Sequence, residues 1–153
     1  DAWKSAVILV NKWDAVDKDS YSMDQYTRNI RHVLKFIDYA PMLFISAMNG
    51  QRVKEVLPLA AKVGSERMVK LSTSQVNRVL EDAQAHQPAP NRAGRSLRIY
   101  YGTQVRSDPP TFLLYCNDPK LLHFTYERFL ENRIRETYGF LGTPIRIVAK
   151  QRE

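Results

Sequence analysis

The sequence contains a single cysteine, Cys116, among its 153 residues. One cysteine excludes a disulfide within the chain and a metal cage of thiolates, and we expect a cytoplasmic protein. Long apolar runs are also lacking, since the run at residues 6–10 is far too short to span a membrane, and no membrane partner is expected. The three histidines, His32, His86 and His123, stand far apart without the spacing of metal ligands, so no metal site is predicted.

The residues that are present have the composition of a folded, soluble protein. Hydrophobic residues make up 44% of the chain and charged residues 25%, which excludes a disordered chain. The 23 Lys and Arg residues outnumber the 16 Asp and Glu residues, and the formal net charge is +7. A basic balance favours a polyanionic partner such as nucleic acid over an acidic or neutral one.

The first half of the chain alternates between strand and helix patterns. We predict strands over residues 5–10 and 42–45, a helix over 23–38 with Ser22 and Gln25 as a capping box, and a second helix from Val53 to Val63. This order is typical of βαβ units with a parallel sheet. Both strands read as buried on two faces, yet two strands cannot cover each other, so we interpret residues 1–71 as the α/β remnant of a larger domain.

The pattern changes near residue 71, where we place a domain boundary, and residues 72–153 form an α-β-β-α-β module of the α+β class. Ser72 begins a capping stretch for a helix over 74–86. Strands are predicted over 97–105 and 111–116, with a turn at Pro109 between them. A long helix is predicted from Pro119 to Tyr138, followed by a last strand over 144–149.

Two short motifs follow the two strands of the first half. The motifs are Asn11-Lys12-Trp13-Asp14 and Ser46-Ala47-Met48. Open α/β sheets bind ligands at the carboxyl ends of their strands, so both motifs are expected at one edge of the sheet. Guanine presents an N1–H and an exocyclic amine side by side, and a carboxylate accepts both as parallel hydrogen bonds. Asp14 is therefore the candidate for selecting guanine.

This pair of motifs resembles the last two nucleotide-binding motifs of translation-factor-related GTPases. The resemblance implies that Asn11 orients the loop and contacts the base, that the Lys12 stem packs against the purine and that Asp14 pairs with N1 and N2. It further implies that the Ala47 N–H meets O6, while Trp13 occupies a variable position. All residues of the two motifs, Trp13, Ser46 and Met48 included, are expected to belong to the nucleotide-binding site. The alternative is a solvated acidic turn formed by Asp14, Asp17 and Asp19; their spacing does not match a calcium loop.

The phosphate-binding half of such a GTPase is missing from the sequence. No Gly-x-x-x-x-Gly-Lys loop occurs, and no residue can be assigned to Mg²⁺ or to catalysis. The resemblance implies GTP or GDP as ligand and Mg²⁺ in an intact parent enzyme. The segment by itself is expected to contact only the guanine base and not to hydrolyse GTP.

From about Leu71 to Lys150 the chain resembles the KH-like domain that closes the Der (EngA) family of bacterial GTPases with two tandem Era-like GTPase domains. The stretches that carry this resemblance are 97–105, 109–112, 123–124 and 142–146. It implies a three-stranded sheet with helices on one face. It also implies that the parent acts in assembly of the large ribosomal subunit, with that subunit or its rRNA as partner and no DNA. Other expected partners are the rest of its own GTPase domain and a preceding GTPase domain.

Candidate RNA contacts come from arginines that lie in a stretch without acidic residues. These are Arg92, Arg95, Arg98 and Arg106. Arginine suits phosphate contact and base stacking, but a solvated basic loop would have the same composition. Six aromatic side chains offer further stacking surfaces, although strand alternation sends about half of such side chains into the core, and core packing is the default for most. They are Tyr100, Tyr101, Phe112, Tyr115, Phe124 and Tyr126.

Gly139-Phe140-Leu141-Gly142 has the form of the GXXG loop with which KH domains clamp RNA. That clamp joins two helices, whereas these glycines follow a helix and lead into a strand, so we interpret them as a helix end and turn. Era pairs a similar GTPase domain with a KH domain but needs the inter-helix loop, which makes it the weaker resemblance. The remaining alternative is a protein-interaction module that senses nucleotide state without binding RNA.

Overall fold

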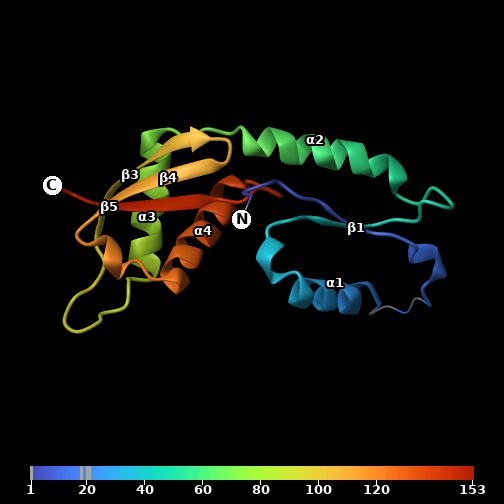
Figure 1. Ribbon diagram of the computed structural model, residues 1–153, viewed down its shortest axis with the longest axis horizontal. Helices are drawn as coiled ribbons and strands as arrows, with labels where there is room; N and C mark the ends of the chain where they lie inside the picture. The colour runs from blue at the N-terminus through green and yellow to red at the C-terminus, as the bar shows by residue number, and fades with distance from the viewer. Residues whose placement is uncertain (1, 18, 20–21) are drawn as a thin grey trace. The chain divides into compact units, whose positions relative to one another are not determined.

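The computed structural model, drawn in Figure 1, describes residues 2–17, 19 and 22–153. The chain divides into two compact units, Asp1–Glu66 with Leu141–Pro144, and Arg67–Phe140 with Ile145–Glu153. A four-residue segment between the last helix and the last strand thus belongs to the first unit, which the sequence did not indicate. In the part of the chain that the structure describes, no helix is long and apolar enough to cross a membrane.

The first unit has the predicted order of strand, helix, strand and helix. Its elements are β1 (Ile8–Val10), α1 (Ser22–Val33), β2 (Met42–Phe44) and α2 (Val56–Arg67). β1 and β2 pair in parallel, with Ile8 opposite Met42 and Val10 opposite Phe44. Among the described residues these two strands are the whole sheet. Large apolar side chains remain exposed on this unit, including Leu9 at 42% and Leu57 at 79%.

Helix α1 is shorter than predicted because it breaks at Leu34. This residue leaves the helical region (φ −102°, ψ 44°), and a short 3₁₀ turn follows at Lys35–Ile37. The Arg31 guanidinium donates hydrogen bonds to the carbonyls of Ala40 at 2.7 Å and Asp38 at 3.2 Å. These bonds draw the chain back toward β2, so a tertiary contact overrides the helical periodicity that the sequence carries through this region.

One predicted helix cap is wrong and the other is confirmed. Ser22 is the first residue of α1, and its Oγ accepts the Asp19 N–H at 3.0 Å instead of forming a capping box with Gln25. Ser72, in contrast, caps helix α3 (Thr73–His86): its Oγ accepts the Gln75 N–H at 3.2 Å, and the Ser72 N–H donates to Gln75 Oε1 at 2.9 Å. This reciprocal pair satisfies two otherwise unpaired donors at the start of α3.

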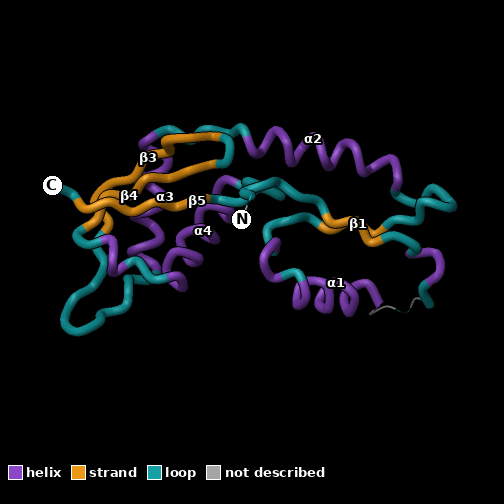
Figure 2. Tube along the Cα trace, in the orientation of Figure 1, coloured by secondary structure: helices purple, strands orange, loops and turns teal. Residues whose placement is uncertain are grey.

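The second unit has the predicted α-β-β-α-β order. After α3 its elements are β3 (Ile99–Ser107), β4 (Pro110–Cys116), α4 (Phe124–Tyr138) and β5 (Arg146–Gln151). The strand order in the sheet is β3-β4-β5 (Figure 2). β3 and β4 form an antiparallel hairpin, and β5 runs parallel to β4. The sheet is therefore mixed, as a strand that returns through a helix to lie beside β4 requires.

The predicted long helix from Pro119 is two separate elements. Pro119–Leu121 form a 3₁₀ turn whose first residues are capped by Asp118 Oδ1, which accepts the Lys120 N–H at 3.0 Å. Leu122 then adopts ψ 94°, outside the helical region, and α4 begins only after His123. Proline at the first helical position starts a helix as expected, but that helix is one turn long.

Both helices of the second unit pack on one face of its sheet. They share a core with Phe112, Leu114 and Cys116 of β4, all at most 1% exposed. The helical members of this core are Val76, Val79, Leu80, Ala83, Tyr126, Leu130 and Ile134. Burial raises the pKa of the Cys116 thiol, which favours its protonated, unreactive form.

Side chains of α3 satisfy the outer edge of β3. Asn77 Oδ1 accepts the Gly102 N–H at 2.9 Å while its Nδ2 donates to the Gly102 carbonyl at 3.0 Å. Gln84 repeats the arrangement on Ile99, with distances of 3.0 and 3.3 Å. A side-chain amide carries the same donor and acceptor as a peptide group, so each takes the place of a residue in a neighbouring strand. The helix thereby covers an edge that would otherwise offer unpaired backbone groups.

The segment Leu141–Pro144 is bound into the first unit by its backbone. The Ala6 N–H donates to the Gly142 carbonyl at 2.8 Å, and the Gly142 N–H donates to the Tyr39 carbonyl at 3.0 Å. Gly142 has φ +69°, and a Cβ there would lie 2.7 Å from both methyl groups of Val63 and 2.9 Å from the Ala6 carbonyl oxygen. Only glycine fits this position.

We expect Asn77→Ala to lower the free energy of unfolding of the second unit by about 1–3 kcal/mol, because both polar groups of the buried Gly102 lose their partner. Urea denaturation followed by circular dichroism measures the change. Arg78→Ala, one residue along the same helix, is the control and should change stability by less than about 0.5 kcal/mol. Equal effects of the two substitutions would show that the side-chain amide does not hold the β3 edge.

We expect Gly142→Ala to destabilise the chain by roughly 2 kcal/mol or more, because a left-handed backbone and a close approach penalise the new methyl group together. The matched control is Gly50→Ala, since Gly50 has φ +80° but nothing within 4 Å of the added Cβ. The control should show only the backbone cost of about 1 kcal/mol in the same denaturation experiment. If both substitutions cost the same, the packing of Gly142 against Val63 and Ala6 is wrong.

Candidate functional site

The two predicted motifs meet at the carboxyl ends of β1 and β2. Parallel pairing continues past the strands, because the Ile45 N–H donates to the Val10 carbonyl at 2.8 Å and the Trp13 N–H donates to the Ile45 carbonyl at 3.1 Å. Residues 11–14 and 46–48 therefore leave the sheet side by side. The structure brings these motifs together at one edge, as parallel strands predict.

Two hydrogen bonds tie the motifs to each other. Ser46 Oγ donates to Asp14 Oδ1 at 2.5 Å, and the Ala47 N–H donates to Asn11 Oδ1 at 3.0 Å. Ser46 is fully buried, so its hydroxyl has a fixed position from which to hold the carboxylate. A charge-assisted bond of this length orients Asp14 while leaving acceptor sites on both of its oxygens.

The backbone conformation of Lys12 lets the Trp13 side chain enter the core while Asn11 and Asp14 remain exposed. Lys12 lies in the left-handed region (φ 60°, ψ 33°), an unusual conformation for a residue with a side chain. Trp13, next to it, is 3% exposed and packs against Phe44 at 4.7 Å and Tyr26 at 5.6 Å between ring centroids. Asn11 and Asp14 on either side of this turn are exposed.

The burial of Trp13 corrects one part of the predicted site. As a member of the motif Trp13 is expected among the ligand-contacting residues, but its ring points into the core between α1 and β2 and does not line the pocket. The packed ring fixes the position of the loop that follows β1. The backbone of the motif is in this way attached to the core at the residue between its two exposed polar side chains.

The exposed members of the motifs line a pocket of about 420 Å³. The lining residues are Asn11, Lys12, Asp14, Ala15, Ala47 and Met48. This volume is in the range of small-molecule sites. A carboxylate and an amide supply acceptors and donors at one edge, while the Lys12 stem, Ala15 and Met48 supply apolar surface. Such an arrangement suits a flat heterocycle with adjacent N–H donors.

The acidic-turn alternative stays a prediction: Asp14, Asp17 and Asp19 are all exposed, but Asp14 differs from the other two in its contacts. Asp14 is bonded to Ser46 across the sheet edge, whereas Asp19 bonds to the Ser22 hydroxyl at the start of α1. The aspartates thus serve different neighbours. Among residues 2–17, 19 and 22–153, no three His, Cys, Asp or Glu side chains gather in a way that could hold a metal ion.

The four candidate RNA-binding arginines do not form one cluster. Arg92 and Arg95 face each other across a turn, with backbone hydrogen bonds of 2.8 and 3.0 Å, and Arg98 follows at the start of the sheet. Arg106 lies eight residues further along, which in an extended strand is roughly 25 Å. The sequence also missed a partner: Asp118 approaches Arg95 to 3.2 Å. The arginine stretch contains no acidic residue in sequence, but in the folded structure an acidic side chain lies beside it.

The Gly139–Gly142 loop is a helix end followed by a turn, as interpreted from its place in the sequence. Gly139 caps α4 with φ 90°, and the Phe140 ring is fully buried in the core of the second unit. Arg135 donates to the Phe140 carbonyl at 2.9 Å. After the loop, residues 143–145 lead into β5, so the glycines lie between a helix and a strand and not between two helices.

Some of the six candidate aromatic side chains are buried and others are exposed, and the sequence did not predict which. Phe112 and Tyr126 are buried in the core, as the default predicted. Tyr100 and Tyr101 are 44% and 43% exposed, and Phe124 is 71% exposed. A strand irregularity between Ile99 and Tyr101 is the cause for the two tyrosines, because it breaks the alternation that would have turned one of them inward.

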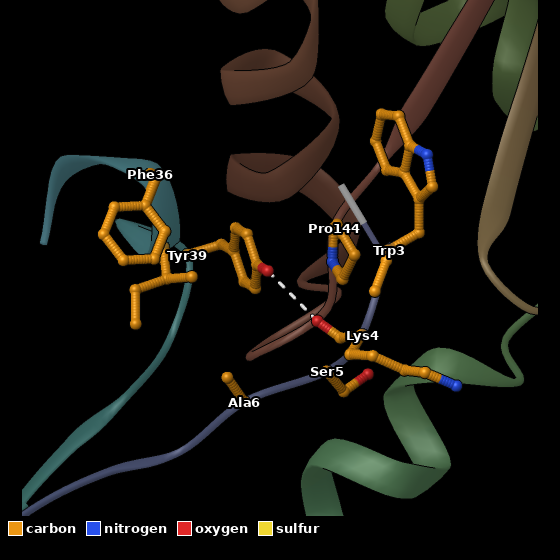
Figure 3. A pocket seen from close by; sticks show the side chains of 9 residues that line it. Trp3, Lys4, Ser5, Ala6, Phe36, Tyr39 and Pro144 are labelled. Carbon is orange, nitrogen blue, oxygen red and sulfur yellow. Dashed lines mark hydrogen bonds between the residues drawn. The ribbon is translucent and has the colours of Figure 1, made fainter.

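A second hollow of the first unit, with a volume of about 340 Å³, lies beside the N-terminal segment. Figure 3 shows Trp3, Phe36 and Pro144 around it, and the Tyr39 hydroxyl donating to the Lys4 carbonyl at 3.0 Å. None of the residues of the two motifs lines this hollow. The pocket at the strand ends, which has a polar edge, is therefore the stronger candidate for a specific ligand.

Comparison with known proteins agrees with the architecture. Residues 70–150 match the family model described as the KH-domain-like of EngA bacterial GTPase enzymes, C-terminal. Proteins named GTPase Der match all 153 residues: that of Geobacillus thermodenitrificans (strain NG80-2) is 49% identical, that of Geobacillus kaustophilus (strain HTA426) 48% and that of Listeria monocytogenes serotype 4b (strain F2365) 46%.

The match covers 100% of this chain but 35% of each of these relatives. The chain thus spans about a third of the length of the curated relatives it matches. The family model alone covers more than half of the chain. The chain belongs to the Der (EngA) family of bacterial GTPases and includes the KH-like domain of that family.

Proposed function

We propose that the first unit supplies the guanine-recognising part of a GTP-binding domain. The observation that carries this proposal is the Asp14 carboxylate, held by the buried Ser46 hydroxyl at the edge of the loop pocket. Guanine N1–H and its exocyclic amine would donate to the two Asp14 oxygens in parallel. A base without this pair of donors leaves the carboxylate unpaired, and such a mismatch can reduce binding by roughly 10⁴-fold.

The other pocket residues complete the recognition of the base. The Lys12 stem and Met48 offer apolar surface to the faces of the ring. The Ala47 N–H already donates to Asn11 Oδ1, so its contact with guanine O6 would be shared between the two oxygens. Asn11 would thereby both hold the two loops together and contact the base. This is the division of roles that the motif resemblance implies.

Phosphate binding and hydrolysis are assigned to parts of a parent enzyme outside these 153 residues. No phosphate loop occurs in the sequence, and the described residues provide no acidic cluster for Mg²⁺. We therefore propose no residue of this chain for the metal or for the transfer of the phosphoryl group. The exposed apolar side chains of β1 and α2, Leu9 and Leu57, are the surface that the rest of a GTPase domain would cover.

For the second unit we propose docking on ribosomal RNA, in support of large-subunit assembly. Family membership suggests this role, and the chain's net charge of +7 agrees with an anionic partner. Arg92 and Arg98 are exposed, and among the described residues, unlike Arg95 with Asp118, neither forms an ion pair. A protein-interaction module that binds no RNA is the competing function, and salt dependence separates the two.

In an intact GTPase that carries this segment, Asp14→Asn should lower GTP affinity by roughly 100-fold or more and shift preference toward xanthosine triphosphate. The reason is that the amide donates where guanine also donates, whereas xanthine offers a carbonyl at that position. Competition between the two nucleotides in a binding assay measures the shift. Asp17→Asn, in the same loop but outside the pocket, is the control and should leave both affinities unchanged. Unchanged GTP preference in the Asp14 variant would contradict the assignment.

Binding of the 153-residue chain to ribosomal RNA should weaken steeply with salt. Replacing Arg92, Arg95 and Arg98 by Ala should reduce the slope of log K against log salt by about 0.7–0.9 for each phosphate that the variant no longer neutralises. A variant with Ala at Lys35, Lys54 and Lys62 of the first unit removes the same charge and should change the slope little. A slope near zero for the unmodified chain would favour the protein-interaction module.

A further inference from the structure

The sheet of the second unit has one face that its own helices do not cover. Alternation along β4 separates the two faces: Phe112 and Leu114 lie in the core with α3 and α4, while Leu113 and Tyr115, which follow them in turn, remain partly exposed. The register places Tyr101 of β3 and Lys150 of β5 in one row with Tyr115. We use the name open face for the side that carries this row and the next one, formed by Thr103, Leu113 and Val148.

Three tyrosines and an arginine meet at one end of the open face. Tyr100, Tyr101, Tyr115 and Arg152 line a shallow hollow of about 410 Å³. The rings of Tyr101 and Tyr115 lie 6.2 Å apart at 39°, and the Arg152 guanidinium carbon is 5.4 Å from the Tyr100 ring centroid. The cation thus lies over an aromatic face, where the ring quadrupole holds it beside the hollow.

The charge of the sheet indicates the sign of its partner. None of the residues of β3, β4 and β5 is acidic. Exposed cations border the tyrosines, with Lys150 in the same row and Arg152 just beyond the end of β5. Arg106, one of the arginines predicted from the sequence, belongs to the other end of β3. Lys150 and Arg152 outnumber the one acidic residue beside them, Glu153, so the tyrosine end of the open face favours an anionic partner.

We infer that the open face binds single-stranded RNA, with unpaired bases stacked on the tyrosines of the hollow and the adjoining phosphates at Lys150 and Arg152. Aromatic side chains about 43% exposed offer π-faces that any base can cover. Bases inside a duplex are already stacked and cannot use them. The inference rests on the RNA docking proposed above and adds the form of RNA and the surface that contacts it.

This surface differs from the arginine stretch in what it can read. Arg92 and Arg95 lie on a loop turn and would contact phosphates, so they do not distinguish paired from unpaired RNA. The open face adds stacking, which requires unpaired nucleotides. The two surfaces can therefore be tested independently, one by removing cations and the other by removing rings.

The test compares binding of the 153-residue chain to fluorescent RNA of about ten nucleotides, single-stranded or as a duplex of equal length, by anisotropy. The single strand should bind more tightly. Tyr101→Leu and Tyr100→Leu should each weaken single-strand binding by about 5- to 100-fold, whereas Tyr101→Phe, which keeps the ring, should retain it. Phe124→Leu, which removes an exposed ring from α4, is the control and should have no effect.

The cations supply an independent readout. Arg152→Ala and Lys150→Ala should each reduce the salt slope for single-stranded RNA by about 0.7, while the tyrosine variants leave that slope unchanged. Circular dichroism establishes that each variant is folded. If one tyrosine variant does not fold, the other tyrosine variant and the two cation variants still decide the question.

Several results would overturn the inference. Equal binding of duplex and single strand, or full affinity in both Leu variants, would place the RNA elsewhere; loss of binding only in the Arg92, Arg95 and Arg98 variant would then leave RNA docking intact on the loop. No RNA binding in any form would refute the docking proposal as well. A concentration-dependent dimer in sedimentation that Tyr101→Leu abolishes would assign the open face to a second copy of the chain.

Discussion

The parallel pairing of β1 with β2 is the constraint on which the candidate guanine site depends. It extends into both loops through the hydrogen bonds at Ile45 and Trp13, so the residues that follow each strand start from fixed positions. Ser46 and Asp14 meet only because the register is the observed one. A shift by one residue would turn every side chain to the opposite face and separate the hydroxyl from the carboxylate. The arrangement of the candidate site is in this sense a property of backbone pairing.

The parts of the structure that sequence could predict are those set by local rules. Ser72 and Gln75 form the expected cap because both partners lie within one helical turn. The two motifs are expected together because parallel strands end at a common edge. The order of elements follows from the same periodicities, and it holds in both units.

Other features depend on contacts between residues that are distant in sequence, and they could not be predicted from local patterns. Arg95 has an acidic partner far along the chain, at Asp118. Tyr100 and Tyr101 are both exposed because of an irregular pairing with β4, which no local pattern announces. Trp13 belongs to a ligand motif by sequence yet serves the core by position. In each case the sequence indicated a candidate residue, and packing decided whether its side chain is available.

The position of the segment Leu141–Pro144 in the chain affects how the protein responds to proteolysis and unfolding. It belongs to the first unit, but along the chain it is flanked on both sides by the second. A protease that cleaves after Glu66 would therefore not release an intact first unit, since the segment that bonds to Ala6 and Tyr39 through Gly142 would remain with the other fragment. Shortened versions of the protein cut at this point would lose part of their fold, and unfolding of one unit should lower the resistance of the other to digestion.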